Sequence, residues 1–416
     1  MLIQRAYRYR FYPTPDQADQ LARSFGCARW IYNWGLKERS TAFYNNGQRV
    51  YYKDLAARLK GLKQDPETSW LSEVSSVVLQ QSLRHLDTAF TKFFKKESDY
   101  PTFKSRRDNQ SCSYMPNAFA FREGKLTLAK HETPLDICWS RPFPKGATPS
   151  SVTVTRTTGG KFYISLLTEE DVSPLPKVKG EVGVDLNTSE IVCSNGKRYA
   201  TPLKLQVLEQ RKRRYQRACR RKVAAAKVSM GLSRNAKLSK GVKLPVSNNL
   251  RKAYWKVGRV TEHAANVRKD WQHKLTTSIV RENQTIAMES LYVRGMTASA
   301  KGSADKPGSN VKAKSGLNRS VLNAGFGEIA RQLEYKAVWA GRTVVKIDRW
   351  YPSSKRCSSC GYVLKSLSLS TRQWVCPDCG QSHDRDLNAS INILMAGKAI
   401  LAGADGLRIH EVGYPA

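Results

Sequence analysis

Four cysteines near the C-terminal end of the chain carry its most specific chemical signal. They form two pairs with the spacing Cys357-x2-Cys360-x15-Cys376-x2-Cys379, and a glycine follows each pair. Two matched Cys-x2-Cys pairs are typical of a zinc site, and four protein ligands close the coordination sphere of a structural ion. Unliganded cysteines or a redox pair explain a matched set less well. We therefore predict a structural Zn2+, with His383 nearby but not required as a ligand.

Three acidic side chains form a second candidate constellation. Asp185 ends the apolar run GEVGVDLNT, Glu289 ends a second run, QTIAMES, and Asp386 opens a helix. Carboxylates gathered from distant strand ends can hold two Mg2+ ions, which would generate the attacking hydroxide and stabilise the leaving 3′ oxygen in phosphodiester hydrolysis. Taken singly, each acid could instead be a cap or a turn residue. Asp384 competes with Asp386 for the third position.

The charge balance points to a polyanionic partner. The 416 residues hold 70 Lys and Arg against 34 Asp and Glu, a formal net charge of +36, which favours nucleic acid. An acidic membrane surface is the alternative, but the sequence shows no apolar run long enough for a transmembrane helix and no signal-peptide core. Nine cysteines, an odd number, argue against a secreted disulfide framework and for an intracellular, reducing compartment.

Basic residues concentrate in one stretch. Between Arg211 and Val260 there are 17 Lys and Arg and no Asp or Glu. A solvated helix face normally mixes both signs, so this run favours phosphate contacts, although a solvated surface explains any single side chain equally well. The candidate nucleic-acid contacts are Arg8, Arg10, Lys104, Arg106, Arg107, Arg211, Arg213, Arg214, Arg217, Arg220 and Arg221.

The first part of the chain predicts a β-barrel with a helical insertion. Residues 2–12 alternate basic with apolar side chains, as a strand with a cationic face does. Thr14 then caps a helix, and further helices are expected over 52–62 and 75–96. About five short alternating runs follow from residue 100, and the N-terminal strand would complete them into a small barrel.

The rest of the chain alternates strands and helices, which must position the acids and the cysteines. Residues 297–320 are rich in Gly, Ser, Lys and Asn, so a mobile segment is expected there, either a disordered linker or a loop that gates the active site. The final residues resemble an untethered tail. The predicted strands are 180–188, 190–196, 284–290 and 343–351, and the predicted helices are 203–228, 248–280 and 326–341.

The order of these motifs resembles that of the TnpB (OrfB) proteins of insertion sequences, relatives of the compact type V CRISPR effector nucleases. The likeness spans nearly the whole chain, because YRYRFYPTPDQ and PTFKSRR in the first part also fit. The most specific matching stretches are GVDLN at 183–187, IAMESLYVRGM at 286–296, RQLEYKAVWAGRTVVKID at 331–348, WYPSSKRCSSCG at 350–361, WVCPDCG at 374–380 and HDRDLNASINIL at 383–394.

This resemblance implies a multidomain fold of the α+β and α/β classes. It implies a wedge-type β-barrel, an inserted helical recognition domain, and an RNase H-like RuvC nuclease domain into which a four-cysteine zinc ribbon is inserted. The implied boundaries are 1–12 and 100–179 for the barrel, 13–99 for the helical domain, 180–355 and 381–400 for RuvC with a basic helical hairpin at 203–282, 356–380 for the zinc ribbon and 401–416 for the tail.

The resemblance also implies an RNA-guided DNA endonuclease encoded by a transposable element and located in the prokaryotic cytoplasm. A guide RNA from the transposon end would pair with target DNA beside a short motif, with one protein per RNA. Asp185, Glu289 and Asp386 would be the three RuvC acids and hold two Mg2+ ions. One alternative is a guide-dependent repressor that binds DNA without cutting it, which the presence of all three acids disfavours. Another is an RNA-binding accessory protein of transposition.

Overall fold

The computed structural model describes residues 1–239, 241–303, 305–368 and 370–403. Its contacts divide the chain into two compact units, Met1–Asp171 with Tyr215–Glu262 and Val172–Arg214 with His263–Ala416. Most of the predicted tail, 401–416, lies outside the described residues. Among the helices of the described part, none has the length and apolar character needed to cross a membrane.

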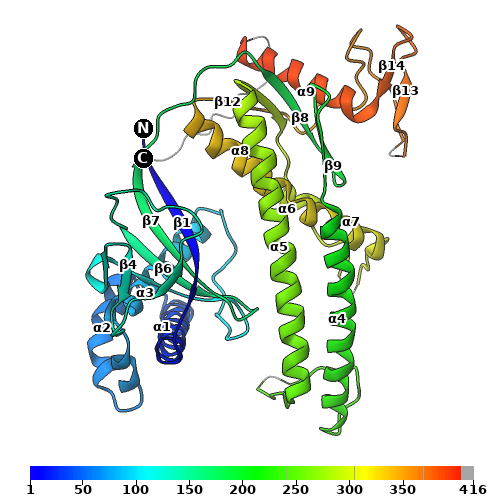
Figure 1. The fold of residues 1–416 in the computed structure, drawn as a ribbon. Coiled ribbons are helices and arrows are strands. Elements are labelled where there is room, and N and C mark those ends of the chain that lie inside the picture. Colours follow the sequence, from blue (N-terminus) through cyan, green and yellow to red (C-terminus); the bar gives the residue numbers. More distant parts are fainter. Residues whose placement is uncertain (240, 304, 369, 404–416) are drawn as a thin grey trace. The chain divides into compact units, whose positions relative to one another are not determined.

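An antiparallel sheet forms the centre of the first unit (Figure 1). Its strands are β1 (Leu2–Tyr12), β2 (Gln110–Tyr114), β5 (Asp136–Cys138), β6 (Ser151–Arg156) and β7 (Phe162–Asp171), in the spatial order β2-β6-β7-β1-β5. β1 shows the predicted alternation, because Tyr7, Tyr9 and Phe11 are buried while the residues between them are exposed or half-buried. The N-terminal strand therefore joins the sheet as predicted.

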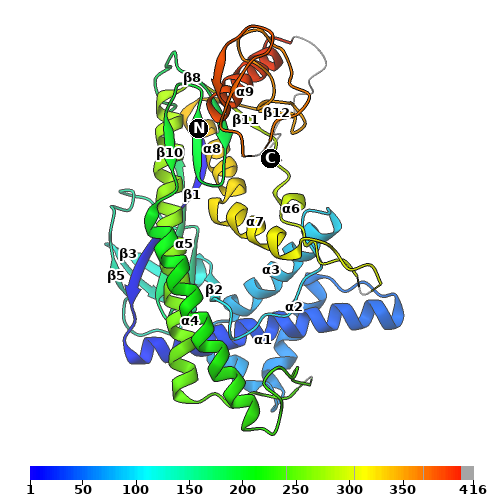
Figure 2. The same cartoon turned by 90° about the vertical axis from the view of Figure 1, so that its right-hand side faces the viewer.

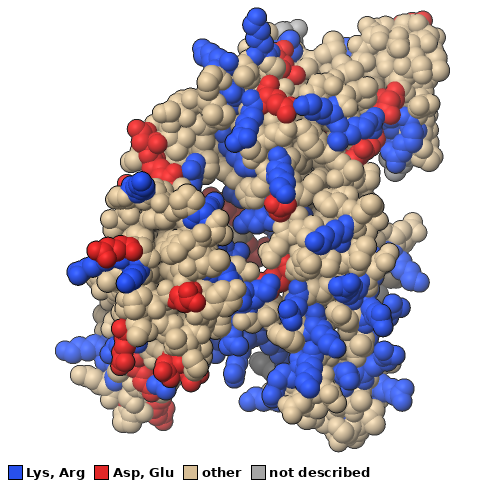
Figure 3. All heavy atoms as spheres, in the orientation of Figure 1, with Lys and Arg blue, Asp and Glu red and all other residues tan. Residues whose placement is uncertain are grey.

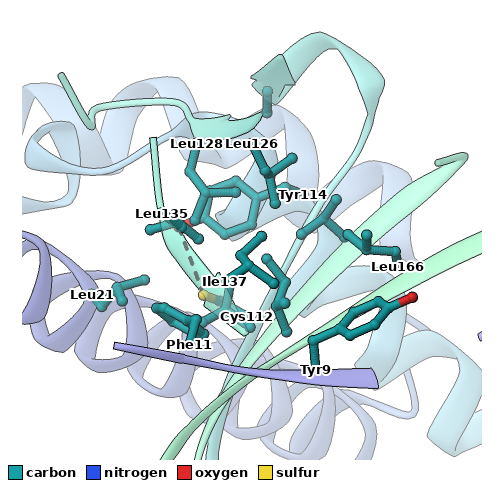
Figure 4. Packing of buried hydrophobic residues seen from close by; sticks show 14 of the residues in the cluster. Tyr9, Phe11, Leu21, Cys112, Tyr114, Leu126, Leu128, Leu135, Ile137 and Leu166 are labelled. Atoms are coloured by element: carbon teal, nitrogen blue, oxygen red, sulfur yellow. Dashed lines mark hydrogen bonds between the residues drawn. The ribbon is translucent and has the colours of Figure 1, made fainter. Parts of the chain in front are cut away.

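The predicted closed barrel is not found. Within the described residues no strand pairing joins β2 to β5, so the five-stranded sheet stays open. After a short 3-10 turn, η2 (Pro116–Ala118), β3 (Phe119–Arg122) and β4 (Lys125–Leu128) pair with each other as a separate hairpin. Leu126 and Leu128 of this hairpin are buried in the core beneath the sheet (Figure 4). The alternating residues of β4, which were predicted to form a strand of the barrel, therefore cover the core instead.

Three helices lie between β1 and β2 along the chain, as predicted. They are α1 (Pro15–Asn46), α2 (Tyr52–Gln64) and α3 (Ser76–Phe94), with a 3-10 turn, η1 (Ser69–Glu73), before α3. Thr14 and Gln17 form a capping box, each side chain accepting a hydrogen bond from the other residue's amide. Leu21 of α1 packs with Phe11 of the sheet (Figure 4), while the rest of the bundle has its own apolar core.

Two long helices, α4 (Leu203–Val228) and α5 (Asn248–Glu282), confirm the predicted ranges to within two residues. They lie side by side along a small apolar seam (Figures 1 and 2). Within the first unit, α5 also meets the turn between β6 and β7, where Trp255 Nε1 donates to the carbonyl oxygen of Gly159 at 3.2 Å. Gly258 permits this approach, because a Cβ there would lie 2.9 Å from the carbonyl oxygen of Thr158.

A mixed sheet forms the centre of the second unit. Its strands are β8 (Glu181–Leu186), β9 (Glu190–Cys193), β10 (Arg198–Ala200), β11 (Thr285–Glu289) and β12 (Thr343–Ile347), in the order β10-β9-β8-β11-β12. β8, β11 and β12 run parallel, whereas β9 and β10 are antiparallel to their neighbours. Parallel strands are usually covered on both faces, which accounts for the apolar runs that predicted β8, β11 and β12.

Helices cover both faces of this second sheet (Figure 1). α9 (Arg385–Leu401) lies on one face, where Ile393 packs with Ala287 of β11. α8 (Phe326–Ala340) and the last turns of α5 lie on the other face, around Val184 and Met288. The absence of a side chain at Gly183 lets α9 come close, because a Cβ there would lie 2.0 Å from the carbonyl oxygen of Ser390.

The prediction that residues 297–320 form a mobile segment is wrong for the second half of that range. After α6 (Val293–Met296), residues Val311–Ala324 form a helix, α7. Val321 and Ala324 are buried, and Asn318 Nδ2 donates to the carbonyl oxygen of Thr297 at 2.8 Å. The polar composition concealed this helix, because side-chain bonds to the backbone and a short apolar end hold it rather than a long apolar stripe.

Candidate functional site

Asp185 and Glu289 end adjacent parallel strands at the same edge of the second sheet. The register pairs Val184 of β8 with Met288 of β11, so the two acids follow at equivalent positions. Val184 and Met288 pack in the core on the side of α5 and α8. Since successive side chains of a strand point to opposite faces, both acids point to the face that α9 covers.

Asp386 reaches the same edge from the first turn of α9. Its side chain is 15% exposed, and its negative charge, like that of Glu289, contributes to raising the pKa of Asp185. Arg372 Nη1 lies 3.6 Å from Asp386 Oδ2 and is itself largely exposed. The fold therefore brings together the three acids singled out in the sequence.

Asp384, the competing acid, is the N-cap of α9. Its Oδ1 accepts a hydrogen bond from the amide of Leu387 at 2.9 Å and lies 2.8 Å from Arg198 Nη2. Burial raises the pKa of the Asp384 carboxyl, but the Leu387 amide and the Arg198 guanidinium outweigh that effect and hold the pKa below its usual value. Asp384 thus starts the helix that presents Asp386.

The acids share a poorly solvated, negatively charged environment. Burial raises the pKa of the Asp185 carboxyl to about 7, with further contributions from Glu289 and Asp386, while a 2.8 Å hydrogen bond from Asn187 Nδ2 to Asp185 Oδ2 opposes the rise. Burial also raises the pKa of Glu289, opposed by Ser353. Carboxylate oxygens are the ligands that a hard divalent cation such as Mg2+ prefers, and the charges of Glu289 and Asp386 both act on Asp185, so the chemistry of these donors suits such an ion.

Two asparagines of α9 fix the loop that carries Ser353. Asn392 Nδ2 donates to the carbonyl oxygen of Ser353 at 2.9 Å, and Asn388 Nδ2 donates to that of Arg356 at 2.8 Å. Asn388 Oδ1 in turn accepts from the amide of Ser358, within the first cysteine turn, at 3.0 Å. Both asparagines are almost fully buried. The helix that carries Asp386 therefore also positions the hydrogen-bond donor of Glu289 and the start of the cysteine module.

The four predicted cysteines converge. Their sulfur atoms all lie within 4.8 Å of one another, with 3.7 Å between Cys357 Sγ and Cys379 Sγ and 3.6 Å between Cys360 Sγ and Cys376 Sγ. Four sulfurs held tetrahedrally at about 2.3 Å from a zinc ion would be about 3.8 Å apart. The cluster therefore fits a zinc ion with four thiolate ligands.

Each Cys-x2-Cys-Gly turn has the same backbone arrangement. The amide of Gly361 donates to the carbonyl oxygen of Cys357 at 2.9 Å, and that of Gly380 donates to Cys376 at 3.0 Å. Both glycines have positive φ, +84° and +71°, a conformation that other residues rarely adopt. Two short strands flank the second turn and pair antiparallel: β13 (Gln373–Val375) leads into it, and β14 (Ser382–Asp384) leads from it to α9.

His383 contacts the cysteine cluster without belonging to the four. Its Nε2 lies 3.0 Å from Cys357 Sγ. Burial raises the pKa of the Cys357 thiol, but the amides of Cys360 and Ser359 and the His383 ring lower it to about 5. A thiolate held in this way is ready to bind a metal ion, and a histidine that hydrogen-bonds a ligating sulfur is a common supporting group.

The predicted nucleic-acid contacts lie at the surface in two settings. The six arginines of α4 are exposed, and in the part of the chain that the structure describes none of them forms an ion pair. Lys and Arg side chains crowd the lower part of α4 and α5 (Figure 3). These six are Arg211, Arg213, Arg214, Arg217, Arg220 and Arg221.

The other predicted contacts lie in the first unit. Arg8 Cζ is 3.9 Å from the ring centre of Tyr163, and Arg10 Cζ is 5.1 Å from that of Tyr12. These two arginines thus also stabilise the sheet by stacking. Lys104, Arg106 and Arg107 are exposed on the segment before β2.

Four residues of the acidic site have no role assigned from the sequence: Asn187, Ser353, Asn388 and Asn392. Asn187 and Asn388 each follow an acid by two positions, in GVDLN and HDRDLN. This spacing could have predicted that a side-chain amide lies beside each acid. Ser353 had none, because its partner Glu289 lies 64 residues earlier in the chain.

Three family models match the chain. The model described as "Helix-turn-helix domain", of the OrfB IS605 type, matches residues 1–48. The model described as "Probable transposase", also of the OrfB IS605 type, matches residues 164–300. The model described as "Cas12f1-like, TNB domain" matches residues 326–393, which include the cysteine cluster and Asp386.

Relatives in two bacteria align over almost the whole chain. A "Putative RNA-guided DNA endonuclease" of Streptomyces pristinaespiralis is 44% identical over 98% of this chain and 92% of its own length. The "Putative RNA-guided DNA endonuclease InsQ" of Escherichia coli (strain K12) is 32% identical over 96% and 93%. Among solved structures, a Cas12f1-sgRNA-target DNA complex is 14% identical with a TM-score of 0.49, covering 94% of this chain and 98% of that one.

Proposed function

The chain belongs to the TnpB (OrfB) family, and on that premise we propose that it is an RNA-guided DNA endonuclease that cuts target DNA beside a short sequence motif. The observation that carries this proposal is the grouping of Asp185, Glu289 and Asp386 at one sheet edge by β8, β11 and α9. Relatives of this chain that align over nine-tenths of their length carry the description of an RNA-guided DNA endonuclease.

In the proposed reaction, the three acids would hold two Mg2+ ions at the sheet edge. The chemistry that such ions would supply is activation of a water molecule for attack on phosphorus and stabilisation of the leaving 3′ oxygen. Asn187 and Ser353 each donate a hydrogen bond to one acid, so they fix the carboxylates and favour their ionised forms. Asp384 and Arg198 hold the start of α9, which sets the position of Asp386.

The proposed division of labour leaves sequence recognition to the RNA. In RNA-guided nucleases, base pairing reads the target while the protein grips nucleic-acid backbones and reads only a short motif. The exposed arginines of α4 and a net charge of +36 suit that role. A guide RNA and target DNA are therefore the proposed partners, with one protein per RNA.

The proposed domain assignment rests on the same grouping of acids. The second sheet with α9 would be an RNase H-like RuvC nuclease, in which the cysteine module at 356–380 is inserted ahead of the third acid. A zinc ion bound by all four sulfurs would have no open coordination position, so its role would be structural. The first sheet with its inserted helices would read the target-adjacent motif.

The proposal is tested first on the RNA that the protein carries. Full-length protein is produced together with the DNA that flanks its coding sequence, and the co-purifying RNA is sequenced. The expected result is one RNA species with a constant part and a variable end. A random mixture of RNA would instead favour an accessory role in transposition.

Cleavage is then measured on a DNA that matches the variable end. The expected result is cutting in Mg2+ but not in excess chelator, and loss of cutting in Asp185→Ala with RNA binding retained. Asp270→Ala is the matched control, because Asp270 is an exposed acid paired with Lys274 on α5. Equal cutting by the two variants would refute the proposal, and specific DNA binding without any cutting would indicate the repressor.

A further inference from the structure

A cavity of about 620 Å³ lies in the first unit between α1, η1 and the segment that follows α3. Its walls are rich in aromatic rings, from Trp30, Trp34, Trp70 and Phe103. The proposed nuclease mechanism uses none of these residues. A volume of this size is within the range of roughly 300–1,000 Å³ that small-ligand pockets occupy.

The tryptophans form a rigid apolar wall. Trp30 and Trp34 are four residues apart on α1, so they share one face of the helix, with ring centres 6.4 Å apart and planes tilted by 5°. Trp70 meets Trp30 edge-on, at 5.4 Å and 81°. All three pack partly against the core of the helical bundle. One side of the wall is thus anchored, while the other lines the cavity.

Phe103 is fixed at the rim of this cavity. Asn33 Nδ2 donates to the carbonyl oxygen of Lys104 at 3.0 Å, and the amide of Lys104 donates to Asn33 Oδ1 at 2.8 Å. The ammonium of Lys104 also lies 4.0 Å above the ring of Tyr32. This tether holds the Phe103 ring beside the cavity although the side chain itself is 62% exposed.

Positive charge surrounds the aromatic wall. Arg23, Arg29 and Lys37 line the cavity, and its one acidic lining residue, Glu73, is paired with Arg23 at 3.3 Å. Within the described residues, neither Arg29 nor Lys37 forms an ion pair.

Arg29 also donates a hydrogen bond to Oε1 of Gln110, and Gln110 Nε2 donates to the carbonyl oxygen of Ser105 at 3.0 Å. The segment that carries Arg106 is therefore held beside Arg29, consistent with a pKa of Arg29 that is lowered by burial and then by the charge of Arg106. Two guanidinium groups in this setting suit a bound phosphate group.

We propose that this cavity binds an unstacked nucleobase of a single-stranded nucleic acid, with the adjoining phosphate on Arg29, Lys37 and Arg106. Proteins bind single strands through aromatic platforms beside a cationic groove, because every base has a face that can stack. Lys104, a predicted backbone contact, directly follows Phe103 of the cavity. The inference rests on the proposed function in that nucleic acid is the partner, but it does not require cleavage.

The test compares two cavity variants with a control on the same helix. Phe103→Leu and Trp34→Leu each remove one ring, and Tyr44→Leu removes an aromatic that is 75% exposed at the end of α1, outside the cavity. Full-length proteins, stripped of RNA by high salt, are titrated with fluorescein-labelled 12-mers of deoxythymidine and of uridine, and with a blunt DNA hairpin. Phe103→Leu provides a second reading if Trp34→Leu folds poorly.

The expected result is that each cavity variant binds a single strand roughly 5- to 150-fold more weakly, the equivalent of removing one base–aromatic stack. Hairpin binding and the Tyr44→Leu variant should be unchanged. Weakening confined to the DNA 12-mer identifies DNA as the source of the base, and weakening confined to the RNA 12-mer identifies RNA. Either result supports the site.

Two results would overturn the inference: single-strand binding by Phe103→Leu and Trp34→Leu equal to that of the control, or an equal loss for single strands and hairpin. The titrations distinguish failure of the nucleobase site from failure of the proposed function. If the unsubstituted protein binds no probe, the nucleic-acid partner of the proposed function is lost as well. If it binds all probes and the variants do likewise, only the nucleobase site is lost.

Discussion

The hydroxyl of Ser353 donates a 2.7 Å hydrogen bond to Oε1 of Glu289, and the backbone carbonyl of the same serine accepts from Asn392 of α9 at 2.9 Å. A single residue thereby connects the second acid to the helix that carries the third. This link orients the Glu289 carboxylate and favours its charged form.

Removing that hydrogen bond should slow cleavage. A bond to a charged group is worth about 1.5–3 kcal/mol, so Ser353→Ala should lower the cleavage rate at saturating DNA roughly 10- to 100-fold and raise the Mg2+ concentration required. DNA affinity should not change, and Ser353→Thr should restore most of the rate. Ser354→Ala is the control, since it alters the neighbouring hydroxyl. Equal rates for the two alanine variants would contradict the role given to Ser353.

Substitutions of Asp386 and of Asp384 should have different effects on cleavage and on thermal stability. Asp386→Asn should abolish detectable cleavage with guide RNA still bound, because it removes one of the three grouped charges. Asp384→Ala should keep measurable cleavage but lower the thermal midpoint, because losing an N-cap costs about 1 kcal/mol. Cleavage assays and thermal denaturation of both variants decide the assignment. The opposite pattern would transfer the third position to Asp384.

The partly buried carboxyl of Asp185 should make stability depend on pH in the absence of Mg2+. The folded state raises the pKa of this carboxyl to about 7, so it holds the proton more tightly than the unfolded chain does. Ionisation therefore costs stability, by an amount that is absent below about pH 4, grows as pH rises, and is complete above pH 7. Asp185→Asn lacks this cost.

The measurement is the difference in thermal midpoint between Asp185→Asn and the unsubstituted protein. It should increase in favour of the variant from pH 4 to pH 7, then level off. The corresponding free energy is at most ~4 kcal/mol, and less because the side chain is only partly buried. Adding Mg2+ at pH 7.5 should reduce or reverse the difference. A difference that is constant across this pH range would contradict the raised pKa.

One zinc ion per chain should be found by elemental analysis. Cys376→Ser should lose the metal and lower the thermal midpoint, whereas Cys138→Ser, which alters an exposed cysteine elsewhere, should do neither. Cleavage should also weaken in Cys376→Ser, because Asn388 joins the first cysteine turn to α9. Full zinc content in Cys376→Ser would rule out the four-sulfur site.

Neutralising arginines of α4 should change the salt dependence of RNA binding. Each phosphate that is no longer neutralised by a cationic side chain lowers the slope of log K against log salt concentration by about 0.7–0.9. The combined variant Arg213→Gln, Arg214→Gln and Arg217→Gln should therefore lower the slope by about 2–3. The control combines Arg58→Gln with Lys274→Gln, because both cations are engaged in ion pairs. An unchanged slope would mean that this face of α4 is only solvated.

Local patterns were enough to predict most elements, because the interactions that form them are close in sequence. The α1 capping box joins residues three apart, and each cysteine turn closes through a bond between residues four apart. The apolar runs before Asp185 and Glu289 likewise identified buried strands. α7 was not predicted because some of the bonds that hold it are not local. Its Asn318 contacts Thr297 and Ala298, which lie twenty or more residues earlier in the chain.

Only the tertiary structure decided how these pieces meet. β3 and β4 pair with each other and not with the five-stranded first sheet, and alternation within a strand carries no information about its partner. The sequence HDRDLN does not distinguish Asp384 from Asp386. In the folded chain, Arg198 and the Leu387 amide bind Asp384. The sequence by itself determined which acids and sulfurs the chain possesses and which local elements bear them. The grouping of the acids, with Ser353 beside Glu289, came from burial and pairing between segments far apart in the chain.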